Sequence, residues 1–196
     1  MDQILEYLRI TLGLSDNELL RTIRQTAYIN HYEKGSFLLR QGECPDGFCV
    51  LINGILRGYF LDKDGTDITD CFGYRMGTIA MPFSDMSMPS PINIEVLEAS
   101  DIFIIPRHTM QELLTHNFEA VQVYNRILLA GATEHWEIKN ALYQYSATDR
   151  YIWFTKRYEG LIDLVAHKYV ASFLGISPVT LSRLRGKIKA QPDPSN

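Results

Sequence analysis

The residues with the clearest chemical potential lie near the C-terminus, in the segment HKYVASFLGISPVTLSRLRG that begins at His167. If a helix starts at Pro178, then Val179, Ser182 and Arg183 share its outward face. Arg can bond guanine O6 and N7 together, Ser can reach a base edge or a phosphate, and Val can contact only a thymine methyl group. These three residues are therefore candidates for reading base pairs in the major groove of DNA.

The apolar spacing around these residues predicts a helix-turn-helix, in which two helices meet steeply across a short turn. Its inward positions are all apolar: Val170, Leu174, Ile176, Leu181 and Leu184. Ala171 is small where the helices would cross, and Gly175 permits the positive φ of the turn. Ser177 is a good N-cap, and Pro178 suits the first helical position because no N–H is needed there. The alternative is a helical corner inside another kind of helical domain.

The distribution of charged residues along the chain favours the helix-turn-helix over the helical corner. Residues 150–196 hold eight Lys or Arg and three acidic residues, a net charge of +5, whereas residues 1–149 hold eleven basic and twenty acidic residues, a net charge of −9. A basic module in an acidic chain indicates a polyanionic partner, and we expect double-stranded DNA. Ser177 and the free N–H groups at its helix start suit a phosphate oxygen. Four more residues are candidates for phosphate contacts, each with a solvated surface as the equal alternative: Lys168, Arg185, Lys187 and Lys189.

Short β-prone runs punctuated by glycine occupy residues 27–105. The runs are Ser36–Leu39, Phe48–Ile52, Ile55–Leu61, Thr66–Phe72, Ile92–Leu97 and Ile102–Ile105. Between them, Asn53-Gly54 predicts a two-residue hairpin, and residues 62–65 predict another turn. Several short strands with regular turns indicate a small antiparallel β roll of the jelly-roll type.

Helices flank this roll on both sides. Two short helices precede it, with Gly13 ending the first and Ser15 and Glu18 forming a capping box for the second. After the roll, residues 117–145 have the pattern of one long helix, and Ser146 is a fresh N-cap for the next helix.

The long helix carries an apolar stripe that is typical of a two-stranded coiled coil, with spacings that alternate between three and four residues. The stripe consists of Val121, Tyr124, Leu128, Gly131, His135, Ile138 and Leu142. The alternative is a helix packed on its own β domain. Further apolar residues beside the stripe, such as Leu129 and Trp136, suggest that the helix does both, with one face on the roll and one on a partner. The pattern therefore predicts that this helix also pairs with a partner.

The expected fold is α+β: N-terminal helices and a β roll in residues 1–116, a dimerisation helix in residues 117–145, and a helix-turn-helix domain in residues 146–196. A hydrophobic content of 46% can bury a core, and no apolar run is long enough to span a membrane. The N-terminus lacks the basic leader of a signal peptide. Three cysteines without a CxxC pair fit reduced thiols, so we expect a cytoplasmic protein.

This order of modules resembles the Crp/Fnr family of bacterial transcription regulators. The resemblance rests on the glycines of EKGSFLLRQGE and GFCVLINGILRGYFLDKDG and on the motif VASFLGISPVTLSRLR. It implies a homodimer with a β roll like a cyclic-nucleotide-binding domain, DNA as a partner, and RNA polymerase as a further partner. It also implies that Val179, Ser182 and Arg183 face the bases of an inverted-repeat site.

The matching nucleotide segment, GTIAMPFSDMSMPSPINIEV, departs from the family pattern. Family members that bind cyclic nucleotides use a Gly-Glu pair for the ribose and an Arg followed by Ser or Thr for the phosphate. Here Thr78 stands in place of the Glu, and Ser90 stands near the Arg position. Because a buried phosphate without a cation is costly, we expect no tight cyclic-nucleotide binding, and the effector stays unknown.

Two further departures concern the DNA-binding part. Many relatives have Glu at the position of Val179, which accepts a hydrogen bond from cytosine N4, so we expect an A·T base pair there. Only KAQPDPSN follows Ile188, so the hairpin wing that usually contacts flanking phosphates is expected to be missing. We then expect weaker binding with a shallower salt dependence.

Other functional classes find less support. A cupin-like metal enzyme, or a small-molecule-binding β roll with helical accessories, would need clustered ligands, yet only His31 of the five histidines lies in the β region. We expect no enzymatic activity, no metal and no cofactor. A redox or ligand sensor is a further alternative. Iron–sulfur relatives need four cysteines, and nothing specific points to haem.

Overall fold

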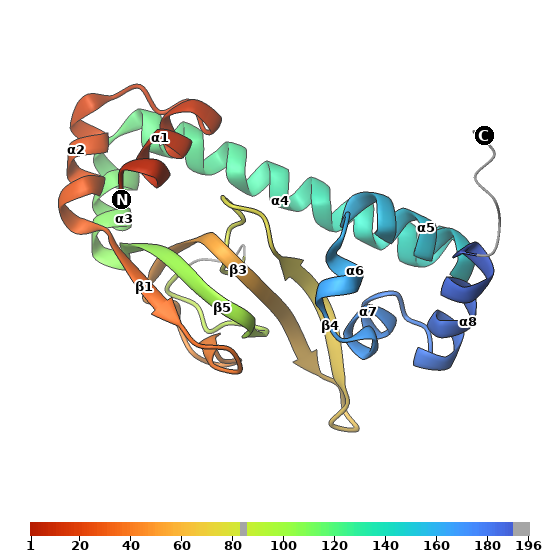
Figure 1. Cartoon of the computed structure of the whole chain (residues 1–196). Helices are drawn as coiled ribbons and strands as arrows, with labels where there is room; N and C mark the ends of the chain where they lie inside the picture. The colour runs from red at the N-terminus through yellow and green to blue at the C-terminus, as the bar shows by residue number, and fades with distance from the viewer. Residues whose placement is uncertain (83–85, 190–196) are drawn as a thin grey trace. The chain divides into compact units, whose positions relative to one another are not determined.

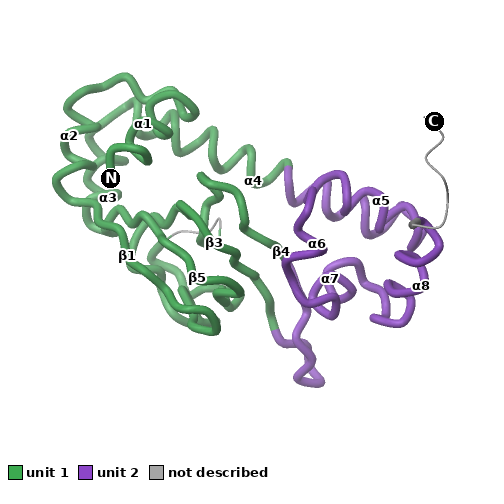
Figure 2. Tube along the Cα trace, viewed as in Figure 1, with its two compact units in different colours: residues 1–60, 71–133 green, residues 61–70, 134–196 purple. Residues whose placement is uncertain are grey.

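The structure is a computed structural model that describes residues 1–82 and 86–189. The chain divides into two compact units (Figure 2). Unit 1 comprises residues 1–60 and 71–133. Unit 2 comprises residues 61–70 and the described residues from 134 onward.

Unit 1 is built on a β-sheet with helices before and after it in the chain (Figure 1). The elements are α1 (Asp2–Thr11), α2 (Asn17–Thr26), β1 (Tyr28–Tyr32), β2 (Phe37–Leu39), β3 (Gly47–Leu61), β4 (Asp67–Gly73), β5 (Asn93–Pro106), α3 (Arg107–His116) and α4 (Phe118–Gln144). The strand order is β1-β5-β3-β4, and β2 also pairs with β5. Strands β1, β2 and β3 all run antiparallel to β5, which confirms the predicted α+β architecture.

Alternate residues of β3 and β5 belong to two different hydrophobic clusters. Val50 and Phe103 belong to the cluster that includes residues of α1, α2, α3 and α4, whereas their neighbours Leu51 and Ile102 belong to the second cluster. Successive side chains of a strand point to opposite faces of the sheet, so the two clusters lie on its two faces. Residues of α1, α2, α3 and α4 cover one face of the sheet, and Leu39 of β2 and Ala80 belong to the cluster on the other face.

The hairpin predicted at Asn53-Gly54 is wrong. Strand β3 runs without reversal from Gly47 to Leu61, and β5 pairs with it on both sides of this point, with shifts of register between Leu51 and Leu56. Gly54 has a φ of 99°, and a Cβ there would collide with Ser100 of β5. The glycine therefore permits a β-bulge and a close approach rather than a turn.

The predicted capping box before α2 is also wrong. Asp16, not Ser15, is the N-cap, and its Oδ1 accepts hydrogen bonds from the N–H groups of Glu18 and Leu19. Ser15 instead donates to the Glu119 carboxylate at the start of α4, through Oγ at 2.6 Å and its backbone N–H at 2.9 Å. Ser15 therefore bonds to a residue distant in sequence instead of capping α2.

Unit 2 contains residues 134–144 of α4 and four further helices: α5 (Ala147–Arg157), α6 (Leu161–Leu164), α7 (His167–Phe173) and α8 (Pro178–Lys189). Ser146 caps α5 as predicted, because its Oγ accepts from the Asp149 N–H. Phe154 and Phe173 are buried, with ring centroids 5.6 Å apart. The expectation that no wing follows α8 falls on residues 190–196, which lie outside the described part of the chain.

The turn predicted at residues 62–65 is present, and it belongs to unit 2. The Asp62 N–H donates to the Thr66 carbonyl oxygen at 2.9 Å, and Gly65 has a φ of 78°. Ser172 of α7 holds this hairpin: its Oγ accepts from the Thr69 N–H at 2.9 Å and donates to the Asp67 carbonyl oxygen at 3.3 Å.

Candidate nucleic-acid interface

Helices α7 and α8 form the predicted helix-turn-helix geometry. The inward residues Val170, Leu174 and Leu181 are at most 1% exposed. Gly175 has a φ of 61° in the turn, a conformation that side chains disfavour. Ser177 Oγ accepts from the Thr180 N–H at 3.1 Å and thereby caps α8. The inward pattern and the cap therefore act together to fix the orientation of the α8 side chains.

The opposite face of α8 presents the three predicted base-reading residues. The Val179 side chain is 80% exposed, and Ser182 and Arg183 are also exposed. The side chains of Ser182 and Arg183 have no hydrogen bond or ion pair within the described part of the chain. Such a face offers a guanidinium, a hydroxyl and an isopropyl group to an external partner.

The predicted phosphate contacts differ in their surroundings. Lys168 and Lys187 are exposed, and Lys189 is the last residue of α8, with a side chain outside the described part. Arg185 is half-buried and pairs with the carboxylate of Asp163 and the ring of His167. Its guanidinium therefore braces α8 against the segment before α7.

Arg150 is a positioning residue that the sequence analysis did not identify. Its Nη1 donates to the Leu142 carbonyl oxygen near the end of α4, at 3.3 Å. The same Nη1 lies 3.5 Å from the place that a Cβ of Gly175 would occupy. Arg150 thus links the last turns of α4 to the turn between α7 and α8. In the sequence, Arg150 follows the Ser146 cap by four residues, and no local pattern there predicts a contact with α4 or with Gly175.

The predicted stripe on α4 lies mostly inside the single chain. Gly131 and Ile138 are buried, and only His135 is exposed. The other four members are half-buried: Val121, Tyr124, Leu128 and Leu142. A different set on α4 is apolar and exposed. Leu129, Trp136 and Tyr143 are 68%, 61% and 80% exposed, and they are spaced seven residues apart.

In the segment that resembles a nucleotide site, hydroxyl groups bond to the protein's own backbone. Thr78 Oγ1 donates to the Arg75 carbonyl oxygen at 2.7 Å, and the buried Ser90 Oγ donates to the Ile92 carbonyl oxygen at 2.6 Å. A cavity of about 10 Å³ near Ala80 and Met81 has room for about one water molecule.

The cysteines are free thiols, and Cys49 is buried. Burial raises the pKa of the Cys49 thiol to about 12, so it stays protonated at neutral pH. Among the described residues, no three His, Cys, Asp or Glu side chains gather where they could hold a metal ion. No helix in the described part combines the length and the apolar character needed to cross a membrane.

Comparison with known proteins places this geometry in a family context. Residues 29–117 match the model of the cyclic nucleotide-binding domain. No curated protein sequence matches the chain.

Several solved structures share the fold over most of their length. FixK2 from Bradyrhizobium japonicum is 16% identical, with a TM-score of 0.72 over 85% of this chain and 86% of that one. CLP from Xanthomonas campestris, a c-di-GMP-responsive global regulator, is 13% identical, with a TM-score of 0.68 over 89% and 92%. A protein from Eubacterium rectale assigned to the Crp/Fnr transcriptional regulators is 18% identical, with a TM-score of 0.66 over 94% and 88%. The sequence resemblance is confirmed at the level of fold: residues 29–117 match the model of a cyclic nucleotide-binding domain, and the chain shares its fold with the Crp/Fnr regulator from Eubacterium rectale.

Proposed function

We propose that this protein is a sequence-specific DNA-binding transcription regulator that acts as a homodimer. Helix α8 enters the major groove, where Arg183 bonds a guanine, Val179 contacts a thymine methyl group and Ser182 reaches a base edge or a phosphate. Two-fold symmetry then requires an inverted repeat whose half-sites lie about 34 Å apart, one turn of the double helix.

The observation that carries this proposal is the exposed face of α8. Val179, Ser182 and Arg183 face outward on a helix whose start is capped by Ser177. The surrounding residues 150–196 carry a net charge of +5. An exposed Arg and Ser without internal partners, in a basic module, fit a polyanionic duplex better than a helical corner does. Exposed Lys168 and Lys187 add contacts to phosphates, which position the helix without specifying a base.

The homodimer forms along α4, through the exposed residues Leu129, Trp136 and Tyr143. A seven-residue repeat of apolar side chains is the pattern by which two helices pair in a left-handed coiled coil. Because large apolar side chains are unfavourable in water, these three residues favour burial against the same three residues of a second copy. The stripe predicted from sequence contributes its half-buried members at the margin of this contact.

Regulation does not use a tight cyclic-nucleotide ligand. Residues 77–96 contain no Lys or Arg, and the hydroxyls of Thr78 and Ser90 already bond to backbone carbonyl oxygens. A cyclic phosphate in that segment would lack a cation. RNA polymerase is a further proposed partner, as the family resemblance implies.

The decisive experiment selects bound duplexes from a random DNA pool with the full chain. We expect an inverted repeat with one dominant sequence per half-site. Fluorescence anisotropy on the selected duplex then compares Arg183→Ala with Arg21→Ala, since both remove one exposed positive charge from a helix. If neither selection nor low-salt titration reveals duplex binding, the proposed function is wrong.

Sedimentation tests the dimer separately. Trp136→Glu places two carboxylates in the α4 contact and is expected to shift the protein from dimer to monomer. Ala130→Glu is the matched control, because Ala130 is exposed on α4 outside the stripe. A dimer that survives Trp136→Glu would contradict the assigned contact.

A further inference from the structure

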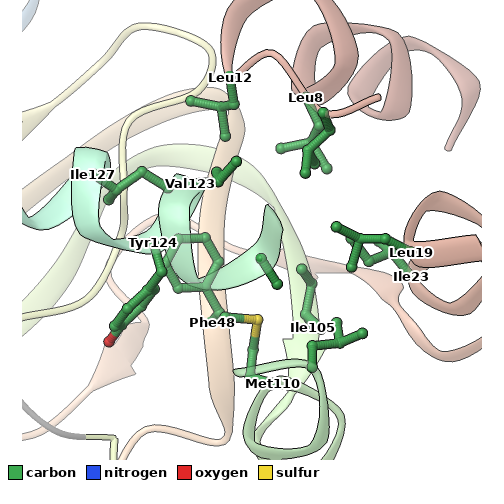
Figure 3. A pocket seen from close by; sticks show the side chains of 13 residues that line it. Leu8, Leu12, Leu19, Ile23, Phe48, Ile105, Met110, Val123, Tyr124 and Ile127 are labelled. Atoms are coloured by element: carbon green, nitrogen blue, oxygen red, sulfur yellow. The ribbon is translucent and has the colours of Figure 1, made fainter. Parts of the chain in front are cut away.

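Unit 1 contains a cavity that none of the proposed functions uses. It has a volume of about 40 Å³ and lies between α1, α2, α3, α4 and the sheet face formed by β3 and β5. Figure 3 shows side chains from these elements converging on one space. Its lining is Leu8, Leu12, Leu14, Leu19, Ile23, Phe48, Ile105, Met110, Leu113, Ala120, Val123, Tyr124 and Ile127.

The lining determines what the cavity can accept. No charged side chain among the described residues borders it, and the Tyr124 hydroxyl is directed away from Leu8 and Leu19 (Figure 3). Water needs two to four polar partners to occupy a cavity, and cavities lined by Leu, Ile and Phe stay dry and bind apolar molecules. A carboxylate or phosphate buried here would lack a partner. Of the nucleotide segment of the roll, around Thr78 and Ser90, no described residue contributes to the lining.

Polar contacts attach the elements that line the cavity to one another. The Glu119 carboxylate of α4 accepts from the Ser15 N–H and Oγ and from the Asp16 N–H, at 2.6 to 2.9 Å. Asn117 Nδ2 donates to Asp16 Oδ2 at 2.7 Å. Hydrogen bonds from Ser15 lower the pKa of Glu119, so the carboxylate is ionised at neutral pH.

A second contact lies further along α4. Arg126 Nη2 donates to the Leu12 carbonyl oxygen at 2.7 Å, near the end of α1. The connection between α1 and α2 is thus attached to α4 at two points, by Glu119 and by Arg126. Since a cavity persists only where its surroundings cannot collapse, these attachments preserve the space.

We propose that this cavity is a binding site for a small, uncharged, apolar molecule. Its volume suits a single xenon atom or a short alkyl group, and the anchored walls make the site preformed. A bound molecule contacts α1, α2 and the first turns of α4 together and stabilises the folded state of unit 1.

Xenon is the probe for the test. In the full chain with labelled Leu, Ile and Val methyl groups, rising xenon pressure is expected to give saturable NMR shifts at Leu8, Leu19 and Val123. The methyl groups of Leu51 and Ile102, in the other cluster of unit 1, are expected to stay unmoved. Butyrate, which is charged, is expected to move none of these signals.

Two variants make the outcome decisive. Ala120→Leu fills the cavity and is expected to abolish the xenon shifts, whereas Ala130→Leu, on the exposed side of the same helix, is expected to retain them. Leu8→Ala enlarges the cavity and is expected to admit benzene. Xenon shifts that are absent, that survive Ala120→Leu, or that butyrate reproduces would each overturn the proposal. DNA binding plays no part in this readout, so the two proposals fail independently.

Discussion

Arg57 in unit 1 and Arg183 in unit 2 carry the same side chain in opposite surroundings. Arg57 is 1% exposed, pairs with Glu95 directly opposite on β5, and lies 4.5 Å from the centroid of the Tyr59 ring. Arg183 is exposed on α8 and has no partner in the described part of the chain. The first cation is committed to its own fold, and the second is available to another molecule.

The hydroxyl groups show the same contrast. Ser90 and Thr78 donate to backbone carbonyl oxygens in the roll, whereas Ser182 is exposed on α8 without an internal partner. A polar group already paired gives little to a ligand, because binding must first break the internal bond. Thr78 and Ser90 of the nucleotide-like segment are therefore committed to the fold of unit 1, whereas the exposed Ser182 and Arg183 of α8 have no side-chain hydrogen bond or ion pair in the described part of the chain.

The largest expected effect is on stability, at Arg57. Arg57→Met leaves the Glu95 carboxylate partly buried without its cation and is expected to lower the free energy of unfolding by about 3 kcal/mol. Urea denaturation measures this loss. Arg21→Met breaks an exposed pair with Glu18 and is expected to change stability by less than about 0.5 kcal/mol. Equal losses in the two variants would erase the contrast between buried and exposed arginines.

At Arg183 the effect is expected in DNA binding instead. Arg183→Ala is expected to cost about 1–3 kcal/mol of affinity and to relax the choice at one base pair per half-site. Its unfolding midpoint in urea should match that of the native chain, since the exposed side chain has no hydrogen bond or ion pair in the described part of the chain. A uniform loss across all duplex sequences would reassign Arg183 to a phosphate contact.

A smaller effect is expected at Val179. Replacing the contacted thymine with uracil removes one methyl group and is expected to cost about 0.8 kcal/mol, the value of one buried methylene. Fluorescence anisotropy with the two duplexes measures the difference. In Val179→Ala, most of this preference for thymine over uracil should vanish. An unchanged preference in that variant would show that another residue reads the methyl group.

The smallest effect is pH-dependent and belongs to unit 1. Asp101 accepts a hydrogen bond from His31 Nδ1 at 2.7 Å, which raises the pKa of His31 and lowers that of Asp101. The histidine contribution to stability is complete below its unfolded pKa of about 6.5 and is lost as the pH rises through the raised pKa. The aspartate contribution is complete above its unfolded pKa of about 3.9 and is lost as the pH falls through the lowered pKa.

Asp101→Asn is therefore expected to flatten the pH dependence of the thermal midpoint in these two ranges, by a small amount because both groups are exposed. DNA affinity at fixed pH should not change with it. A steeper pH dependence in the variant would contradict the assigned pair.

Local patterns predicted helices α7 and α8 and the turn between them well, since their determinants lie within twenty residues. The buried spacing of Val170, Leu174 and Leu181, the positive φ of Gly175 and the Ser177 cap are all as expected. Each depends on helix periodicity or on a hydrogen bond to a residue three positions away, so the chain's own order contains the information.

Other expectations failed where a distant partner competed for the same residue. Gly54 has the positive φ that a hairpin needs, but β5 pairs along both sides of it and turns the feature into a bulge. Ser15 has the chemistry of an N-cap, but Glu119, more than a hundred residues away, accepts its hydrogen bonds. In neither case does the local sequence contain the competing group.

Sequence patterns alone were sufficient to predict the order of the helical and β-strand regions, the helix that carries the candidate base-reading residues, and the basic charge around it. Only the tertiary structure decided which face of α4 remains exposed, that Arg185 pairs with Asp163, and that a cavity persists between α1, α2 and α4. The physical reason is the distance along the chain over which each kind of interaction acts. Periodicity and capping act between near neighbours, whereas burial, ion pairing and empty volume depend on which distant segments meet.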